Sequence, residues 1–289
     1  MTNMKNEEYM GLLPPTDEEC QEFDLYCSSN TSSFSVLGVE QFSCGQVVEY
    51  SDSSFQDFLD KRIKFAASRK MKIVPTTAQH INQSSLGSCT GASGTTGQMS
   101  AVYNSTLFGV PAIVPRLNCS VAYLKARGRW GSGLSIVKFQ RTIMEFGNAS
   151  VASAGEYSIR SPGKTTGFDN MQYQCWTCNL KNKEQVVKVL KAGIPVCWGS
   201  GVIPVTALNG KITRTKSGAH AMCFNGFNHG SGMVRFTNTW GMYYPADAEN
   251  QWGLDIYPDE IDKLQIFSRF GSPYAIVGQE FKLKMIYVK

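Results

Sequence analysis

The chain has 289 residues, of which 42% are hydrophobic and 11% aromatic, a composition typical of a globular protein with a large core. No run approaches the 18 apolar residues of a membrane-spanning helix, and the N-terminus lacks the basic start and apolar stretch of a secretory signal. We therefore expect a soluble protein, with no membrane partner, that is cytoplasmic or is delivered by a larger assembly.

The net charge of +5 is unevenly distributed along the chain. Residues 1–60 hold twelve of the 23 acidic residues and one basic residue, Lys5, so the remainder is strongly basic. This asymmetry fits an acidic segment that contacts the basic body of the same chain, and equally a solvated extension without a partner. The Lys and Arg residues are dispersed and form no dense run or known module, so nucleic-acid binding is not expected.

The acidic N-terminal part, residues 1–70, is interpreted as an extension that acts as a pro- or regulatory segment. Its first 50 residues are rich in Ser, Asn and Glu and are interrupted by Pro14 and Pro15, which favours local structure over an independent domain. The apolar spacing of residues 55–71 predicts a helix that ends before Pro75.

Residues 71–289 are expected to form the main domain, and they divide into two halves. Apolar periodicity predicts helices over residues 89–108, 134–146 and 182–192. Short apolar runs between glycine-rich turns then predict strands near residues 195–198, 220–224, 233–237 and 275–277. A helical half followed by a strand-rich half predicts an α+β protein with a cleft between them.

Nine cysteines occur in the chain, and without a secretory signal they are interpreted as reduced, mostly buried thiols. Cys175 and Cys178 form a lone CxxC pair. No second pair and no histidine stands at metal-ligand spacing from them, so we expect neither a metal nor another cofactor.

The segment from Asn82 to Thr90 places Cys89 in a setting suited to nucleophilic catalysis. A cysteine attacks as the thiolate, and the N-terminus of the predicted helix favours negative charge at Cys89. Gly87 allows a tight turn and the close approach of a substrate carbonyl. The side-chain amide of Gln83, six residues earlier, can join the Cys89 backbone N–H in holding an oxyanion.

Two later segments supply a base and a group that orients it. His220 has small neighbours, Ala219 and Ala221, at the start of a predicted strand. The amide oxygen of Asn238 can accept the imidazole N–H and fix the tautomer, and Trp240 can shield that bond from water.

The chain contains two further histidines that are candidates for the base. His80 lies only nine residues before Cys89, and His229 lies in a glycine-rich turn, so His220 is preferred over both.

In this order Gln83, Cys89, His220, Asn238 and Trp240 resemble the papain family of cysteine proteases. Members of that family carry the catalytic His and Asn about 130–150 residues after the Cys. Here the two separations are 131 and 149 residues.

The resemblance covers residues 70–289 and implies a two-lobed fold. A helical N-terminal lobe would carry Cys89, and a β-rich C-terminal lobe would carry His220 and Asn238. The chain is most similar to the bacterial-type branch, in which Gly-Ser-Cys is followed by Thr, here Thr90. Leu86 stands where the family signature has a first cysteine, so the family's structural disulfide is not expected.

The activity implied by the resemblance is that of a cysteine endopeptidase acting on a peptide or protein substrate. The Cys89 thiolate would attack the peptide carbonyl, with the oxyanion held by Gln83 and the Cys89 N–H. His220 would protonate the leaving amine, and water would hydrolyse the thioester.

Three other functions remain open from the residues alone. A papain-like scaffold can serve as a structural or binding component of a larger assembly, such as a viral particle. A cell-wall peptide hydrolase also places a Cys before a His. A transglutaminase-like acyltransferase normally has Asp as its third member, so Asn238 argues against it.

Overall fold

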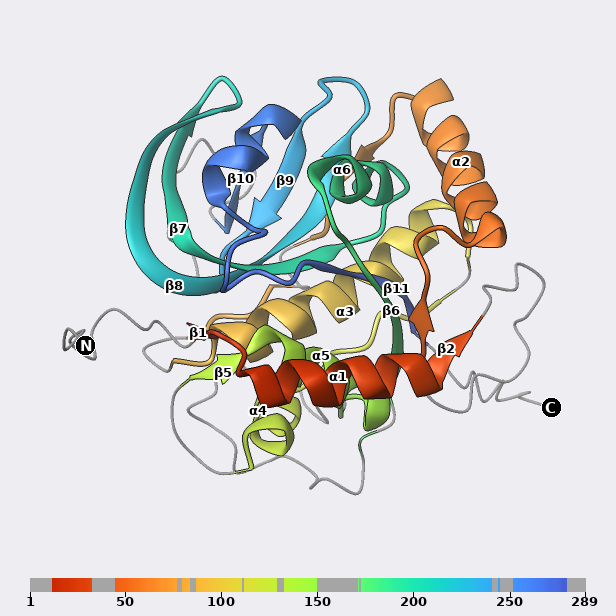
Figure 1. The fold of residues 1–289 in the computed structure, drawn as a ribbon. Helices are drawn as coiled ribbons and strands as arrows, with labels where there is room; N and C mark the ends of the chain where they lie inside the picture. Colours follow the sequence, from red (N-terminus) through yellow and green to blue (C-terminus); the bar gives the residue numbers. More distant parts are fainter. Residues whose placement is uncertain are drawn as a thin grey trace.

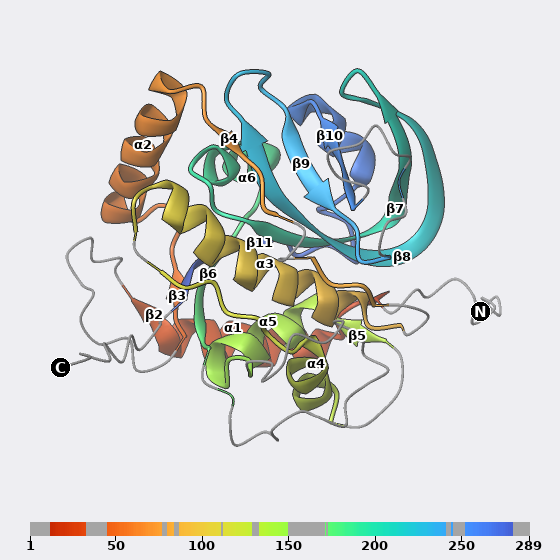
Figure 2. The same cartoon turned by 180° about the vertical axis from the view of Figure 1, so that it is seen from behind.

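A computed structural model of the chain describes residues 12–32, 45–76, 80–83, 87–110, 112–128, 133–149, 171, 173–240, 244 and 252–279. Helix α3 (Cys89–Leu107) runs through the middle of the molecule, between a helical layer and a curved sheet (Figure 1). The helical layer contains α1 (Asp17–Asn30), α4 (Cys119–Arg127) and α5 (Ile136–Glu145). Helices α2 (Ser53–Ser68) and α6 (Lys183–Lys191) lie on the same side of α3 as the part of the sheet within residues 196–237, as the reverse view shows (Figure 2). The predicted α+β class is confirmed.

The sheet has the strand order β10-β9-β8-β7-β11-β6-β3-β2, and β4 also pairs with β8. Its longest pair is the antiparallel hairpin of β7 (Val196–Leu208) and β8 (Lys211–Asn228). The other strands are β2 (Thr31–Ser32), β3 (Val47–Val48), β4 (Lys72–Ile73), β6 (Cys175–Asn179), β9 (Val234–Thr237), β10 (Gly253–Ile256) and β11 (Tyr274–Gln279). Two short strands, β1 (Leu12–Leu13) and β5 (Leu134–Ser135), form a second, parallel pair. A 3₁₀ helix, Pro258–Leu264, precedes β11.

Helix α3 is buried along most of its length, and its glycines let it approach its neighbours closely. A Cβ at Gly94 would lie 2.3 Å from the ring of Phe139 in α5, and one at Gly97 would lie 2.7 Å from Sγ of Cys197 in β7. Gly91 stands similarly close to α4. Glycine weakens an isolated helix by up to about 1 kcal/mol relative to alanine. Here close packing on both sides explains why it is present.

The segment before residue 71 shares the sheet and the core with the rest of the chain. Strand β3 lies between β2 and β6 in the large sheet. Helix α2 begins after Asp52, whose carboxylate accepts the N–H of Phe55 at 2.9 Å. Phe55 and Leu59 are fully buried in one cluster with Trp198 and Phe224 of the sheet. A chain that begins near residue 70 would lack these core side chains.

The predicted helices 55–71, 89–108, 134–146 and 182–192 appear as α2, α3, α5 and α6. The four predicted strands lie within β7, β8, β9 and β11, although β7 and β8 extend well beyond the predicted runs. Helix α1 buries one side chain, Phe23, and carries little apolar periodicity. Among the described residues, none of the helices combines the length and hydrophobicity that crossing a membrane requires.

None of the eight cysteines in the described part of the chain forms a disulfide, and six of them are buried. Cys44 lies outside the described residues. Cys175 and Cys178 lie within β6. Across the described ranges, no group of three His, Cys, Asp or Glu side chains is placed to hold a metal ion.

We predict that Gly94→Ala lowers the free energy of unfolding by about 1–3 kcal/mol, as overpacking of a core does, although alanine is the better helix former. Urea denaturation followed by circular dichroism measures the change. The matched control is the double variant with Phe139→Leu, which removes the ring edge and should recover part of the loss. A more stable Gly94→Ala protein would contradict the packing argument.

Candidate active site

Cys89 is the first residue of α3, where the N–H groups of the first turn lack helical partners. Ser88 is the N-cap residue of this helix, and its carbonyl accepts the N–H of Ala92 at 3.0 Å. The backbone N–H of Ala221 in β8 donates to Sγ of Cys89 at 3.4 Å. The thiol therefore lies beside the strand that carries His220, although the two residues are 131 positions apart in the chain.

His220 and Asn238 lie on neighbouring segments of the sheet and meet through their side chains. Nε2 of His220 is 2.8 Å from Oδ1 of Asn238. The amide orientation is fixed because the N–H of Thr239 also donates to Oδ1, at 2.7 Å, while Nδ2 donates to the hydroxyl of Tyr244 at 3.2 Å. An amide oxygen only accepts hydrogen bonds, so Nε2 carries the hydrogen. In the neutral ring Nδ1 is then an acceptor, and no group in the described part of the chain donates a hydrogen bond to it.

The ring of His220 is covered on one face by Trp240. The two ring centroids are 4.4 Å apart and the planes are inclined by 27°. The ammonium group of Lys216 lies over the same indole, 4.9 Å from its centroid. These contacts restrict the imidazole to one orientation and shield its bond to Asn238.

The electrostatics of the described conformation favour neutral groups. Burial raises the pKa of Cys89 to about 12, against hydrogen bonds from the Ala221 and Thr90 N–H groups that lower it. Burial lowers the pKa of His220 to about 4; the bond to Asn238 opposes this shift, and the charge of Lys216 adds to it. Near neutral pH the pair is therefore thiol and imidazole, both fully buried.

Gln83 is anchored to the segment that follows Asn238. Its backbone N–H donates to the carbonyl of Thr239 at 2.8 Å, and its Oε1 accepts the Thr239 hydroxyl. The amide oxygen of Gln83 therefore faces Thr239. Residues 84–86, between Gln83 and the helix, lie outside the described residues.

Cys89 and His220 are fully buried, and β1 packs into the core cluster that contains Cys89. Leu12 is fully buried in the same cluster as Cys89, Leu134 and Ala221. Its Cδ2 would lie 2.7 Å from a Cβ at Gly199, the residue of β7 that pairs with Ala221. Two cavities, of about 590 and 460 Å³, are lined by residues of α1 and do not include Cys89 or His220.

The structure thus joins His220 to Asn238 by a hydrogen bond, places the Cys89 thiol against the backbone of Ala221, and anchors Gln83 to Thr239. Among the described residues, Nδ1 of His220 makes no hydrogen bond to the thiol. It also adds three residues that the motif analysis does not identify: Tyr244, Lys216 and Leu12. Their contacts depend on how the strands pair and on the packing of β1 into the core. No residue type or spacing in the sequence signals them.

The other two histidines are placed differently. The ring of His80 lies 5.3 Å from that of Trp252, and the described residues offer no hydrogen-bond partner to either of its nitrogens. Nε2 of His229 pairs with the carbonyl of Lys191 at 2.9 Å. Neither has a described contact with Cys89.

No protein-family model and no curated protein sequence matches this chain. Solved structures do resemble it. Xylellain, a cysteine protease from Xylella fastidiosa, is 16% identical with a TM-score of 0.48, over 71% of this chain and 84% of that one. The clostridial cysteine protease Cwp84, after propeptide cleavage, is 16% identical with a TM-score of 0.52, over 69% of this chain and 54% of that one. Digestive procathepsin L 3 of Tenebrio molitor is 13% identical with a TM-score of 0.45, over 90% and 86%.

At these identities the likeness is one of fold. The superposition on Cwp84 shows that the chain has the papain-like fold that the motif order implied. This likeness in fold does not assign a role to any individual residue; such assignments rest on the geometry of this site.

Acid should destabilise the protein through its buried neutral histidines, and His80 tests this. Burial lowers the pKa of His80 to about 3, whereas an unfolded histidine has a pKa near 6.5. Above pH 6.5 the ring is neutral in both states; below it, only the unfolded chain takes up the proton, so stability falls. Between pH 7.5 and pH 5, protonation of His80 in the unfolded chain lowers the free energy of unfolding by about 2 kcal/mol.

His80→Phe should remove this contribution to the pH dependence of stability. The measurement is the difference between the free energies of unfolding in urea at the two pH values. The comparison is independent of any packing change that is the same at both pH values. An unchanged pH dependence would show that His80 is protonated in the folded protein.

Proposed function

We propose that the chain is a cysteine peptidase that hydrolyses peptide bonds through Cys89, His220 and Asn238. The observation that carries the proposal is the state of the His220 ring, whose Nε2–H is held by Asn238 while Nδ1 has no hydrogen-bond partner among the described residues. The thiol of Cys89 accepts a hydrogen bond from the adjacent residue, Ala221. A base with an available lone pair beside a thiol at a helix N-terminus is what nucleophilic acyl transfer needs.

In the proposed reaction, Nδ1 of His220 takes the thiol proton and the thiolate attacks the carbonyl carbon of the substrate. The Cys89 N–H and the Gln83 amide stabilise the oxyanion. His220 then donates the proton to the leaving amine, and a thioester remains. Water, deprotonated by His220, hydrolyses the thioester, which releases a carboxylic acid and restores the thiol.

We also propose that the N-terminal segment holds the site closed and that β1 must leave before substrate enters. Leu12 lies against Gly199 of the sheet, while its strand pairs with Leu134 of the helical layer, so β1 bridges the two sides of the site. Its departure would admit water and reduce the burial that favours the neutral thiol and imidazole. The thiolate and imidazolium then stabilise each other.

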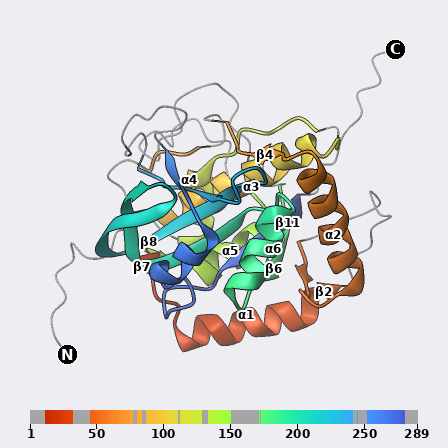
Figure 3. The same ribbon diagram turned by 90° about the horizontal axis from the view of Figure 1, so that it is seen from above.

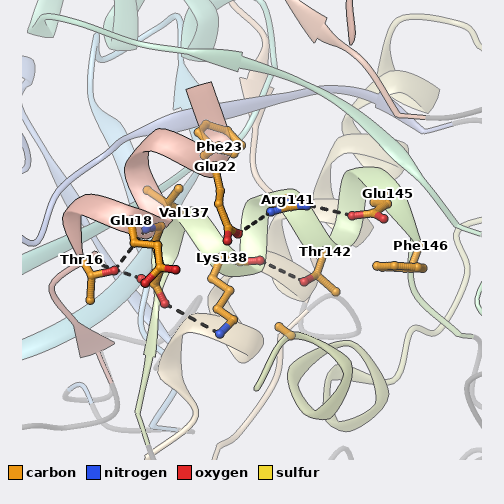
Figure 4. Close-up of a pocket in the computed structure, with 12 residues that line it drawn as sticks. Thr16, Glu18, Glu22, Phe23, Val137, Lys138, Arg141, Thr142, Glu145 and Phe146 are labelled. Carbon is orange, nitrogen blue, oxygen red and sulfur yellow. Dashed lines mark hydrogen bonds and ion pairs between the residues drawn. The ribbon is translucent and has the colours of Figure 1, made fainter. Parts of the chain in front are cut away.

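Helix α1 connects β1 to the surface through contacts that are individually weak. It lies along one edge of the molecule (Figure 3) and buries only Phe23. Glu22 pairs with Arg141 at 2.8 Å across an open groove (Figure 4), and Glu19 lies 3.8 Å from Lys138. Such exposed pairs contribute about 0–1 kcal/mol each. The anchoring is light enough for the segment to be displaced.

The nucleophile is tested with an epoxide affinity probe for papain-type thiols. We expect it to label the wild type and to leave Cys89→Ala unlabelled. The matched control is Cys119→Ala, which removes another buried thiol at the first position of a helix and should label like the wild type. His220→Ala should lower peptide hydrolysis by about 10²–10⁴-fold, the usual contribution of a general base.

Two outcomes would contradict the peptidase proposal. One is equal labelling of the wild type and Cys89→Ala. The other is the absence of labelling and hydrolysis in every protein, including the variant with an opened site described next.

The closing role of β1 is tested by Leu12→Asp in the full chain. A carboxylate at this buried position costs several kcal/mol unless the strand leaves the groove, so probe labelling and peptide hydrolysis should become faster. Leu25→Asp is the matched control, because Leu25 belongs to the same segment but is 70% exposed. Rates for Leu12→Asp no higher than those of the wild type and Leu25→Asp would refute the closing role.

A further inference from the structure

A cation, the ammonium group of Lys216, lies near the proposed general acid, His220. Lys216 is exposed on β8, four residues before His220, and its ammonium group lies over Trp240, which stacks on the His220 ring. Within the described ranges, no carboxylate lies within ion-pair distance of this ammonium group. The ammonium group thus lies against an aromatic face, and none of the carboxylates that the structure describes pairs with it.

The reaction determines which part of a substrate would meet this cation. The leaving amine must come within hydrogen-bond reach of His220 to receive its proton. The residues that follow the scissile bond are attached to that amine, so they leave the site past the ring and its cover, Trp240. Leu12 occupies a different place, against Gly199 and the strand at Leu134.

We propose that Lys216 selects substrates that carry a carboxylate side chain within the first few residues after the scissile bond. This inference rests on the proposed peptidase function. Arg214, two residues earlier on β8 and also exposed, extends the positive charge away from the site on the same face of the strand. Aspartate or glutamate in the leaving segment would therefore meet opposite charge at more than one position.

The charge of Lys216 also acts on the base. It lowers the pKa of His220, so in the free protein it opposes the imidazolium that acyl transfer requires. A substrate carboxylate beside the ammonium group offsets that effect. An acidic leaving segment should therefore improve the chemical step as well as binding.

The test compares two peptides that differ only in having Asp or Lys at the second and third positions after the scissile bond. In the Leu12→Asp background we expect the Asp peptide to have the higher kcat/KM, by about fivefold, the upper range for one exposed ion pair. Adding Lys216→Glu should abolish or invert this preference. Lys211→Glu makes the same charge change at the turn of the hairpin, away from Trp240, and should retain it.

A preference that survives Lys216→Glu, or that Lys211→Glu reduces equally, would overturn the inference. Raising the salt concentration should weaken the preference, because exposed charges are screened.

A binding measurement separates this inference from the peptidase proposal. The full chain carrying Cys89→Ala is titrated by calorimetry with two product-type peptides that have a free amine, Ala-Asp-Asp-Gly-amide and Ala-Lys-Lys-Gly-amide. Tighter binding of the acidic peptide, lost with Lys216→Glu but not with Lys211→Glu, supports the inference even if no hydrolysis is found. Equal affinities for the two peptides would overturn it whatever the peptidase assay shows.

Discussion

The close packing of α3 between the helical layer and the sheet is the constraint on which the rest of the structure depends. With glycine at positions 94 and 97, the ring of Phe139 and the sulfur of Cys197 approach the helix axis at distances that a Cβ would not allow. This packing sets the position of Cys89 at the end of α3 relative to β8. A thiol and an imidazole that are far apart in the chain can meet only because both layers are held against the same helix.

The second level of organisation is the hydrogen bonding around Asn238. Its amide oxygen receives the Thr239 N–H as well as the His220 N–H, and its amide nitrogen donates to Tyr244. The hydroxyl of Tyr244 in turn donates to the carbonyl of Pro204 in β7. The histidine tautomer is therefore determined by groups from several segments of the sheet, and it leaves Nδ1 as the acceptor.

Closure and recognition use different sides of this arrangement. The N-terminal strand lies between Gly199 and Leu134, where we propose that it closes the site. Lys216 and Trp240 lie on the outer face of the imidazole. In the proposed function, the N-terminal segment controls access and protonation, while Lys216 selects the leaving segment of the substrate. Both proposals follow from contacts with the same ring and its neighbouring strand.

The sequence by itself determined the α+β class, helices α2, α3, α5 and α6, and the candidate residues Gln83, Cys89, His220 and Asn238. These follow from apolar periodicity and from residue types at characteristic separations, both of which can be read from the order of residues along the chain. The tertiary structure alone decided that β1 pairs with β5, that the segment before residue 71 shares the core, and that Lys216 lies over Trp240. Two-residue strands carry too little pattern to be recognised, and contacts between distant residues arise from packing, which no local pattern records.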